Sequence, residues 1–183
     1  MTEREKALAG LEFIRGDKDL KAARDRAELL CWQYNSTSPA DTAKKAEILG
    51  QLIKNAGEGC YIKSPFICEY GEYITLGKNF FANYNCKILD GGPITFGDNV
   101  LVGPDCTFVT AVHPTDPARR LAGWQIFKPI TVGSNVWFGV GVKVCPGVTI
   151  GDNCVIGACS VVTKDIPANS VAVGNPCKVI RKA

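Results

Sequence analysis

Aliphatic residues recur every six positions over most of the chain, and a small or branched residue usually follows four places after each one. The repeat is most regular near the C-terminus, where Val132 leads to Val136 and Ile150 leads to Cys154, and it extends upstream as far as Leu76. A six-residue repeat is typical of a coil of short parallel strands, and such a coil buries its apolar side chains only when its turns stack. Each hexad then predicts one flat face of a three-sided prism with an aliphatic interior.

Residues 1–58 lack this repeat and show helical spacing instead. A capping box at residues 2–5 predicts a short first helix, and an apolar stripe predicts a second helix that begins near Asp17. The third helix is expected to take Ser38-Pro39 as its N-cap and first residue and to end at Gly57. These helices carry too few apolar residues for a core of their own. We therefore predict that the segment packs against one end of the coil.

Residues 59–183 form the predicted β-helix domain, which ends in a C-terminal tail. The regular repeat starts near Ile74, and a two-residue shift at 90–93 predicts a wider corner. A larger interruption spans 113–125, and the repeat resumes on its far side. We therefore expect this segment to be a loop ejected from the coil, and excursions of this kind are often functional.

Composition narrows the range of possible functions. The chain has 183 residues, of which 46% are hydrophobic and 21% charged, and these values are ordinary for a single globular domain. A net charge of +3 is too small to indicate a nucleic-acid-binding protein. Polar residues interrupt the apolar stretch 130–158, so a membrane span is not expected there. The N-terminus is charged and has no apolar signal core, which predicts a cytoplasmic protein.

Nine cysteines are scattered without a C-x-x-C pair, so neither a disulfide framework nor a zinc site is expected. Cys86, Cys106 and Cys154 fall at the small inward position of the repeat and are predicted to be buried. The chain has one histidine, His113, at the root of the ejected loop, and Pro114 follows it. On the residues alone, a catalytic and a structural role for His113 both remain open.

Eight stretches, together with the helical segment 9–35, match one family in sequence and in order. They are 79–83, 94–100, 113–114, 129–133, 135–137, 146–153, 162–167 and 174–180. Through these motifs the chain resembles the maltose/galactoside O-acetyltransferases, which are hexapeptide-repeat acyltransferases. The resemblance implies a left-handed parallel β-helix and a homotrimer whose active sites lie between subunits. It also implies acetyl-CoA as the acetyl donor, a sugar as the acceptor and no metal.

The resemblance implies a mechanism as well. His113 would act as the general base that takes the proton of a sugar hydroxyl as this attacks the thioester of acetyl-CoA. A backbone N–H would stabilise the oxyanion, and the protonated imidazole would then protonate the CoA thiolate. Transfer in this family is direct, without an acyl-enzyme.

The resemblance assigns two sets of binding positions. The acceptor set is Asn83, Asp90, Asp17, Glu69 and Gln125. The cofactor set is Asn83, Trp137, Gly139, Val140, Ala158, Thr163, Lys164, Lys178 and Arg181. Taken alone, Asn83 is typical of a left-handed corner, Asp90 of a turn and the cations of a solvated tail.

Departures from the family pattern concern the acceptor side. Arg15 stands where galactoside enzymes carry an acidic residue, Glu69 where they have a small polar or acidic contact, and Gly91 where they have a second acidic residue. The alternative that the protein acetylates a non-sugar hydroxyl, such as that of an antibiotic, therefore stays open.

A non-catalytic β-helix that serves as an assembly module is a further alternative. The zinc carbonic anhydrases of this fold need three histidine ligands per metal, and this chain supplies one.

Overall fold

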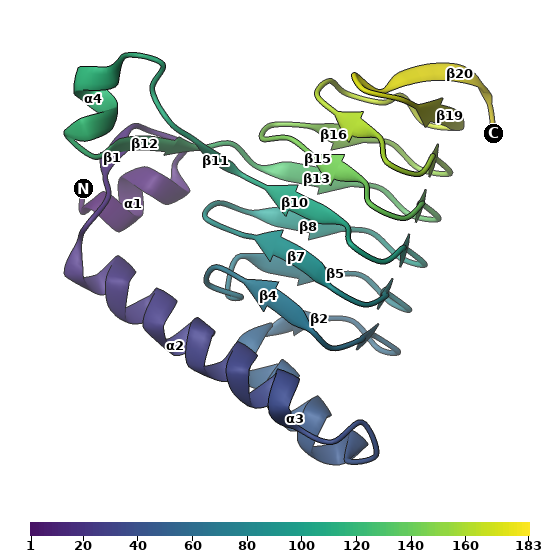
Figure 1. Cartoon of the computed structure of the whole chain (residues 1–183), viewed down its shortest axis with the longest axis horizontal. Coiled ribbons are helices and arrows are strands. Elements are labelled where there is room, and N and C mark those ends of the chain that lie inside the picture. The colour runs from purple at the N-terminus through teal and green to yellow at the C-terminus, as the bar shows by residue number, and fades with distance from the viewer.

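A computed structural model describes all residues, 1–183, as a three-sided prism of parallel strands with helices at its N-terminal end (Figure 1). The first sheet contains β4 (Phe66–Cys68), β7 (Cys86–Leu89), β10 (Thr107–Val109), β15 (Lys143–Val144) and β18 (Val161–Val162). The second contains β2 (Asn55–Ala56), β5 (Ile74–Leu76), β8 (Ile94–Phe96), β13 (Ile130–Val132) and β16 (Thr149–Ile150). The third contains β3 (Tyr61–Ile62), β6 (Phe81–Ala82), β9 (Leu101–Val102), β14 (Trp137–Phe138), β17 (Val155–Ile156) and β19 (Ser170–Val173), and β20 (Lys178–Lys182) closes it as an antiparallel edge.

The interior of the prism holds the inward residue of each hexad. Phe80, Phe96, Phe108 and Phe138 form a column along the axis, with successive ring centroids 4.9, 5.0 and 5.2 Å apart. All four rings are fully buried, as are the aliphatic residues around them. Tilted and edge-on aromatic pairs of this kind add to the stability that burial supplies. The predicted inward positions of Cys86, Cys106 and Cys154 are confirmed, since all three are fully buried.

One corner of the prism carries a ladder of asparagines. Asn79, Asn99, Asn135, Asn153 and Asn169 all have positive φ, a conformation that asparagine tolerates better than most residues. Each side-chain Nδ2 donates to the Oδ1 of the next asparagine, at 2.9, 3.1, 3.0 and 2.9 Å. The ladder thereby links successive turns through side chains as well as through the backbone.

The outward faces of two sheets differ in chemistry. The second sheet presents a threonine face, made of Thr75, Thr95, Thr131 and Thr149 in register. The third sheet presents an aromatic face, made of Tyr61, Phe81, Leu101 and Trp137 in register. Leu101 and Trp137 project outward from the coil, and their side chains are 50% and 55% exposed although both are large and apolar. A row of exposed apolar residues on one face is typical of an interaction surface.

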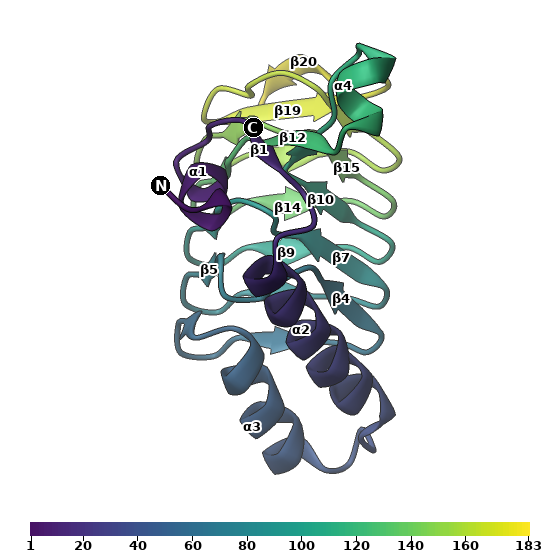
Figure 2. The same cartoon turned by 90° about the vertical axis from the view of Figure 1, so that its left-hand side faces the viewer.

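The helices α2 (Lys18–Ser36) and α3 (Thr42–Leu52) lie at the first turns of the coil, whereas α1 (Glu3–Leu8) lies beside the segment ejected from it (Figure 2). The helix α1 has the predicted capping box, and α2 begins after Asp17 as predicted. The helix α3 corrects a prediction, because its N-cap is Asp41 and not Ser38. Asp41 accepts the N–H of Lys44, so its carboxylate takes the capping role two residues after Pro39.

The coil also starts earlier than the sequence predicted. α3 ends at Leu52 rather than at Gly57, and Asn55–Ala56 already pairs with β5. The predicted boundary at residue 58 therefore falls inside the first turn. The repeat is hard to recognise there because small Ala56 replaces a larger aliphatic residue. None of the helices combines the length and apolarity that a bilayer crossing would need.

Candidate active site at the ejected hairpin

The interruption at 113–125 is an ordered hairpin rather than an irregular loop. β11 (Ala111–Val112) pairs antiparallel with β12 (Trp124–Phe127), and α4 (Pro117–Leu121) lies between them. The carboxylate of Asp116 caps α4 by accepting the N–H groups of Ala118 and Arg119. Asp116 and the following Pro117 favour a helix start, which explains why this short segment is helical.

The N-terminal segment holds the hairpin in place. β1 (Phe13–Ile14) pairs with β12 and completes a three-stranded sheet in the order β1-β12-β11. The rings of Phe13 and Phe127 lie 4.8 Å apart, and both are buried in a small cluster separate from the main core. The N–H of Arg15 donates to the carbonyl of Gly123 at 3.0 Å. The segment before α2 therefore fixes where the hairpin stands relative to the coil.

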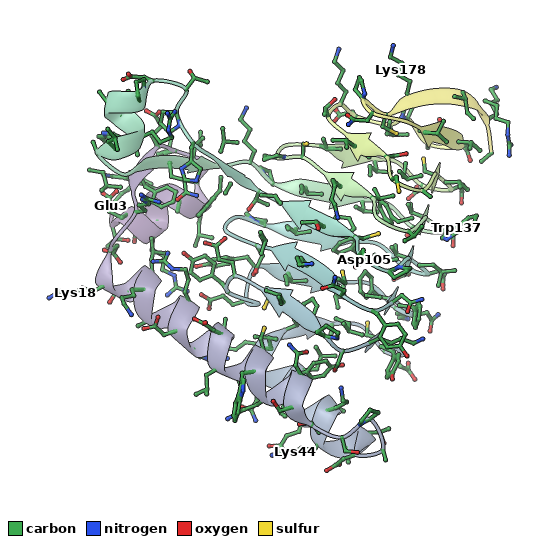
Figure 3. All side chains as sticks on the ribbon, in the orientation of Figure 1. Glu3, Lys18, Lys44, Asp105, Trp137 and Lys178 are labelled. Carbon is green, nitrogen blue, oxygen red and sulfur yellow. The ribbon has the colours of Figure 1, made fainter.

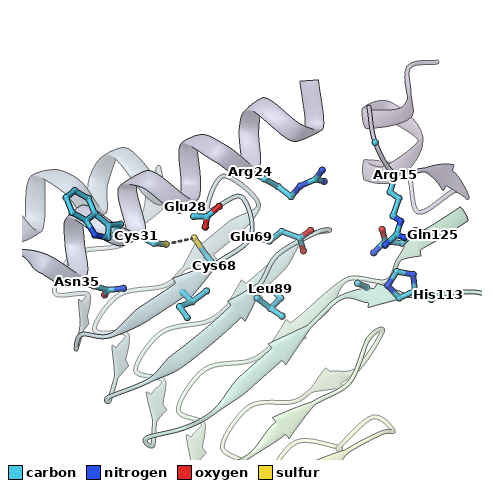
Figure 4. Close-up of a pocket in the computed structure, with 14 residues that line it drawn as sticks. Arg15, Arg24, Glu28, Cys31, Asn35, Cys68, Glu69, Leu89, His113 and Gln125 are labelled. Carbon is cyan, nitrogen blue, oxygen red and sulfur yellow. Dashed lines mark hydrogen bonds between the residues drawn. The ribbon is translucent and has the colours of Figure 1, made fainter. Parts of the chain in front are cut away.

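A cavity of about 970 Å³ opens between the hairpin, α2 and the first sheet (Figure 4). His113 stands at its edge with an exposed ring, directly after β11. Gln125 from β12 and Arg15 from the end of β1 lie beside it, and Glu69 and Leu89 line the wall formed by the coil. The structure thus brings together three of the predicted site residues, His113, Glu69 and Gln125. An imidazole and a carboxyl in one cavity provide groups that can hold and transfer protons.

The electrostatics of the coil wall are set by burial. Burial raises the pKa of Glu69, the negative charge of Asp90 raises it further, and Arg24 on α2 opposes both. Arg24 donates to the hydroxyl of Tyr70 at 2.8 Å and lies over its ring. A carboxyl in this setting accepts a proton more readily than an exposed one, because the charged form loses solvation.

Asp90 does not contact the cavity, which corrects one prediction. Its carboxylate is fully buried, and it accepts the N–H groups of Glu69 and Tyr70 at 2.9 Å and that of Tyr73 at 3.2 Å. Burial raises its pKa to about 6 despite these hydrogen bonds. Asp90 therefore shapes the turn that presents Glu69, and the interpretation of Asp90 as a turn residue is the one the structure favours.

Asp17 is a second correction on the acceptor side. Its Oδ1 accepts the N–H groups of Asp19 and Leu20 and so caps α2. The cavity is lined by Arg15 and Gly16 instead, one and two residues earlier. Gly91, the remaining departure noted in the sequence, has a packing reason. A Cβ at Gly91 would lie 2.2 Å from Cε1 of Phe127, so the ring from the hairpin leaves no room for a side chain.

Asn83 does not adopt the left-handed conformation that its position in the repeat suggested. Its φ is not positive, unlike that of Asn79 and Asn85 on either side. Its Oδ1 accepts the N–H of Tyr84 at 2.9 Å, and its Nδ2 makes no hydrogen bond within the chain. The amide of Asn83 thus keeps donors available for a ligand at the end of β6.

The remaining predicted cofactor residues lie on the aromatic face and beyond it. Gly139 stacks on Ala158, because a Cβ at Gly139 would lie 2.7 Å from the backbone nitrogen of Ala158. Trp137 and Val140, close to Gly139 in the sequence, have exposed side chains. Figure 3 shows Trp137 pointing outward on the side of the coil away from the hairpin, and Lys178 projecting at the C-terminal end. Thr163, Lys164, Lys178 and Arg181 are all exposed.

Within one chain, none of the cofactor residues lines the cavity at His113. The structure therefore places His113, Glu69 and Gln125 on one side of the prism and Trp137 on another. The sequence also missed the wall that α2 contributes. Arg24, Glu28, Cys31, Trp32 and Asn35 line the cavity at helical spacing. That spacing was visible in the sequence, but nothing there showed that this side of the helix faces the hairpin. No three histidine, cysteine or acidic side chains are grouped so as to hold a metal ion.

Comparison with known proteins identifies the family. Residues 6–57 match the maltose acetyltransferase hexapeptide capping motif, and residues 129–164 match the bacterial transferase hexapeptide model of six repeats. The chain is 42% identical over 182 residues to the galactoside O-acetyltransferase of Escherichia coli K12, with 100% of this chain and 89% of that protein covered.

Two solved structures show the same architecture. A maltose O-acetyltransferase from Clostridium difficile 630 superposes with a TM-score of 0.98 at 46% identity, covering 100% of this chain and 97% of that one. A hexapeptide-repeat acetyltransferase from Vibrio cholerae, complexed with acetyl coenzyme A, superposes with a TM-score of 0.92 at 38% identity, covering 100% and 98%. These matches confirm the predicted left-handed parallel β-helix of hexapeptide repeats. With the hairpin, the capping helices and the coil all matched, the chain belongs to the maltose and galactoside O-acetyltransferase family of hexapeptide-repeat acetyltransferases.

Proposed function

We propose that the protein transfers an acetyl group from acetyl-CoA to a hydroxyl of a sugar such as maltose, glucose or a galactoside. The observation that carries this proposal is the cavity beside the hairpin, which has the single histidine of the chain at its edge. Sugar hydroxyls are poor nucleophiles at neutral pH, and a neutral imidazole is the side chain best suited to take their proton.

Each step of the transfer has a group in the chain that suits it. His113 takes the proton of the acceptor hydroxyl, whose oxygen attacks the thioester carbonyl. A backbone N–H at the edge of the cleft stabilises the oxyanion. As the C–S bond breaks, the imidazolium returns its proton to the thiolate of CoA. No step requires a covalent intermediate on a protein side chain.

The aromatic face is the proposed donor side. The exposed ring of Trp137 offers an apolar surface for the pantetheine arm, and the small residues Gly139 and Ala158 stand beside it on successive turns. Beyond them, Lys164, Lys178 and Arg181 present cations that suit the phosphates of CoA. The related V. cholerae structure complexed with acetyl coenzyme A supports a donor of this kind.

A homotrimer with active sites between subunits accounts for the separation of the two sets. His113 and Trp137 lie on different sides of the prism, so a second copy must bring its aromatic face toward the cavity at the hairpin. The exposed aromatic face is consistent with such a contact, because large apolar side chains in a row gain stability when they are covered. In this arrangement Asn83 of one subunit lies close to both substrates, with its free Nδ2 available to the acceptor.

An acceptor screen tests the proposal directly. Purified protein is incubated with acetyl-CoA and a panel of neutral sugars, charged sugars and non-sugar alcohols, and released CoA thiol is measured. We expect the highest turnover with a hexose or glycoside. Turnover confined to non-sugar hydroxyls would instead favour the alternative that Arg15, Glu69 and Gly91 keep open. No turnover with any acceptor, in a protein that still binds CoA by calorimetry, would contradict the proposed function.

A further inference from the structure

Two cysteines from distant parts of the chain meet in the wall of the cavity. Cys31 projects from α2 and Cys68 from β4, and their sulfur atoms lie 3.6 Å apart (Figure 4). Both residues line the cavity, although little of either side chain is exposed. No disulfide joins them, so the wall contains two free thiols in contact.

Rigid elements hold the two thiols together. α2 packs along β4, and Asn35 fixes it there with two hydrogen bonds to Phe66, one to the carbonyl at 2.9 Å and one from the N–H at 2.8 Å. Asn35 lies one helical turn after Cys31, and Phe66 lies two residues before Cys68. The contact between the sulfurs is therefore set by the same packing that builds the cavity.

The other seven cysteines have different surroundings. Cys106 and Cys154 lie inside the prism and hydrogen-bond backbone carbonyls, at 3.2 Å to Gly139 and 3.2 Å to Pro167. Cys159 is exposed but has no second sulfur within contact. Only Cys31 and Cys68 combine a partner thiol with access from a cavity.

The pair is also asymmetric in acidity. A hydrogen bond from the thiol of Cys68 lowers the pKa of Cys31, and this effect outweighs burial and the negative charges of Asp90 and Glu28. The contact with the sulfur of Cys31 raises the pKa of Cys68, and burial raises it further. Cys31 is thus the better thiolate, and Cys68 retains its proton, as in other thiol pairs that react in sequence.

We propose that Cys31 and Cys68 form an oxidisable dithiol, which a two-electron oxidant of the peroxide class converts into a disulfide that ties α2 to β4. The Cys31 thiolate attacks one peroxide oxygen, the O–O bond breaks, and the hydroxide released leaves as water after taking a proton. The sulfur of Cys68 then attacks the sulfenic sulfur of Cys31, the S–O bond breaks, and the thiol proton of Cys68 leaves in a second water. Two thiols and one peroxide thereby give one disulfide and two waters.

Formation of the bond requires the two sulfurs to move closer together, which draws α2 toward the coil. Glu28 and Trp32 lie on α2 next to Cys31 and also line the cavity, so they move with it. This consequence rests on the proposed function, in which the cavity holds the acceptor. The oxidised protein should then show a severalfold higher KM for the acceptor and an unchanged KM for acetyl-CoA.

The chemical test does not depend on activity. The full-length protein is treated with hydrogen peroxide, free thiols are titrated after denaturation, and peptides are mapped under non-reducing conditions. We expect two thiols per chain to disappear, a peptide linking Cys31 to Cys68 to appear, and dithiothreitol to reverse both changes. The variant Cys159→Ser should behave in the same way, whereas Cys31→Ser and Cys68→Ser should not form the link.

The proposal is wrong if wild-type protein keeps both thiols, or if Cys31 stops at the sulfenic acid while Cys68 stays reduced. Mapping of the wild-type protein decides this even if a serine variant fails to fold. An unchanged acceptor KM in the linked protein would refute the effect on the cavity. A linked protein that acetylates no acceptor, before or after reduction, would refute the proposed function and leave the dithiol established.

Discussion

The coil and the hairpin ejected from it meet at one side of the prism, but they are stabilised in different ways. In the coil successive turns repeat contacts of the same kind, as in the phenylalanine column and the asparagine ladder. The hairpin repeats nothing, and it is held by pairing with β1 and by the contact of Phe13 with Phe127. Its His113 is exposed and makes no hydrogen bond within the chain. The comparison indicates that stability resides in the periodic part and chemistry in the part that interrupts it.

The largest expected effect is a loss of activity without a loss of stability when His113 in the hairpin is replaced. Replacing His113 by Ala should lower turnover about 10²–10⁴-fold, the usual range for loss of a general base. The unfolding midpoint should not change, because the ring is exposed and has no partner. Steady-state kinetics and urea titration measure the two quantities, and Leu121→Ala, at an 86% exposed position of α4, is the matched control. Full activity in the His113 variant would rule out the mechanism.

The converse effect is expected in the coil. Phe96 lies between Phe80 and Phe108, with ring centroids 4.9 and 5.0 Å away. Phe96→Ala should lower the free energy of unfolding by about 3–5 kcal/mol, because it leaves a cavity in the column. Phe96→Leu, which keeps more of the volume, should cost clearly less. Denaturant titration measures both variants, and equal losses would contradict the importance of the ring contacts.

The junction between the two regions should respond to pH through Asp90. Its pKa is raised from 3.8 to about 6 in the folded protein, so the folded state binds more protons than the unfolded state between these values. Stability should therefore fall as pH rises from about 4 to about 6, by about 2–3 kcal/mol at most. Urea titrations across this range should show the slope in the wild-type protein. Asp90→Asn should flatten it, and an unchanged slope would mean that another group is responsible.

A smaller loss is expected where the hairpin covers the coil. Gly91→Ala places a Cβ against the ring of Phe127, and the resulting strain should cost about 1–3 kcal/mol. Gly50→Ala in α3 is the control, because its Cβ meets open space and alanine favours helix. That variant should gain a few tenths to about 1 kcal/mol. Thermal unfolding of the two variants should move in opposite directions, and a neutral Gly91 variant would show that the hairpin is not held firmly against the coil.

The smallest expected effect concerns the far end of the coil. Replacing both Lys178 and Arg181 by Gln should raise the KM for acetyl-CoA roughly tenfold, since about 1.4 kcal/mol of charge-assisted binding is lost. The KM for the acceptor should barely change. Lys182→Gln on the same strand, β20, controls for a general loss of positive charge. An equal rise in both KM values would refute the placement of these cations on the donor side.

Sequence alone predicted the coil well because its physical signal is repeated many times. Each turn restates the same inward aliphatic positions, so a single irregular hexad such as that at Ala56 shifts a boundary without hiding the fold. The capping box of α1 and the start of α2 near Asp17 were equally local and are confirmed. The prediction of Ser38 as the N-cap of α3 was wrong. Ser38 and Asp41 are both residue types that favour N-caps, and Asp41 takes this role in the structure.

The site was harder to predict because it depends on contacts between distant segments. His113, Glu69 and Gln125 do meet in one cavity, but the wall of α2 could not be placed without knowing where the helix packs. The family resemblance placed Asp90 at the acceptor, but its carboxylate accepts backbone N–H groups of the coil instead. His113 and Trp137 come close together only if a second subunit packs against the cavity, and that arrangement remains a proposal.

The asparagine ladder gives the coil a chemical polarity. Every Nδ2 donates toward the C-terminal end, so the amide dipoles align, and hydrogen bonds in such a chain strengthen one another. At the start of the ladder, the position one turn below Asn79 is Gly59, which also has positive φ but carries no side chain to form a further rung. At the far end, the N–H of Ala183 donates to the carbonyl of Asn169. A protein engineer could therefore lengthen this solenoid by inserting whole turns between the two ends, but reversing one rung would set two donors or two acceptors against each other.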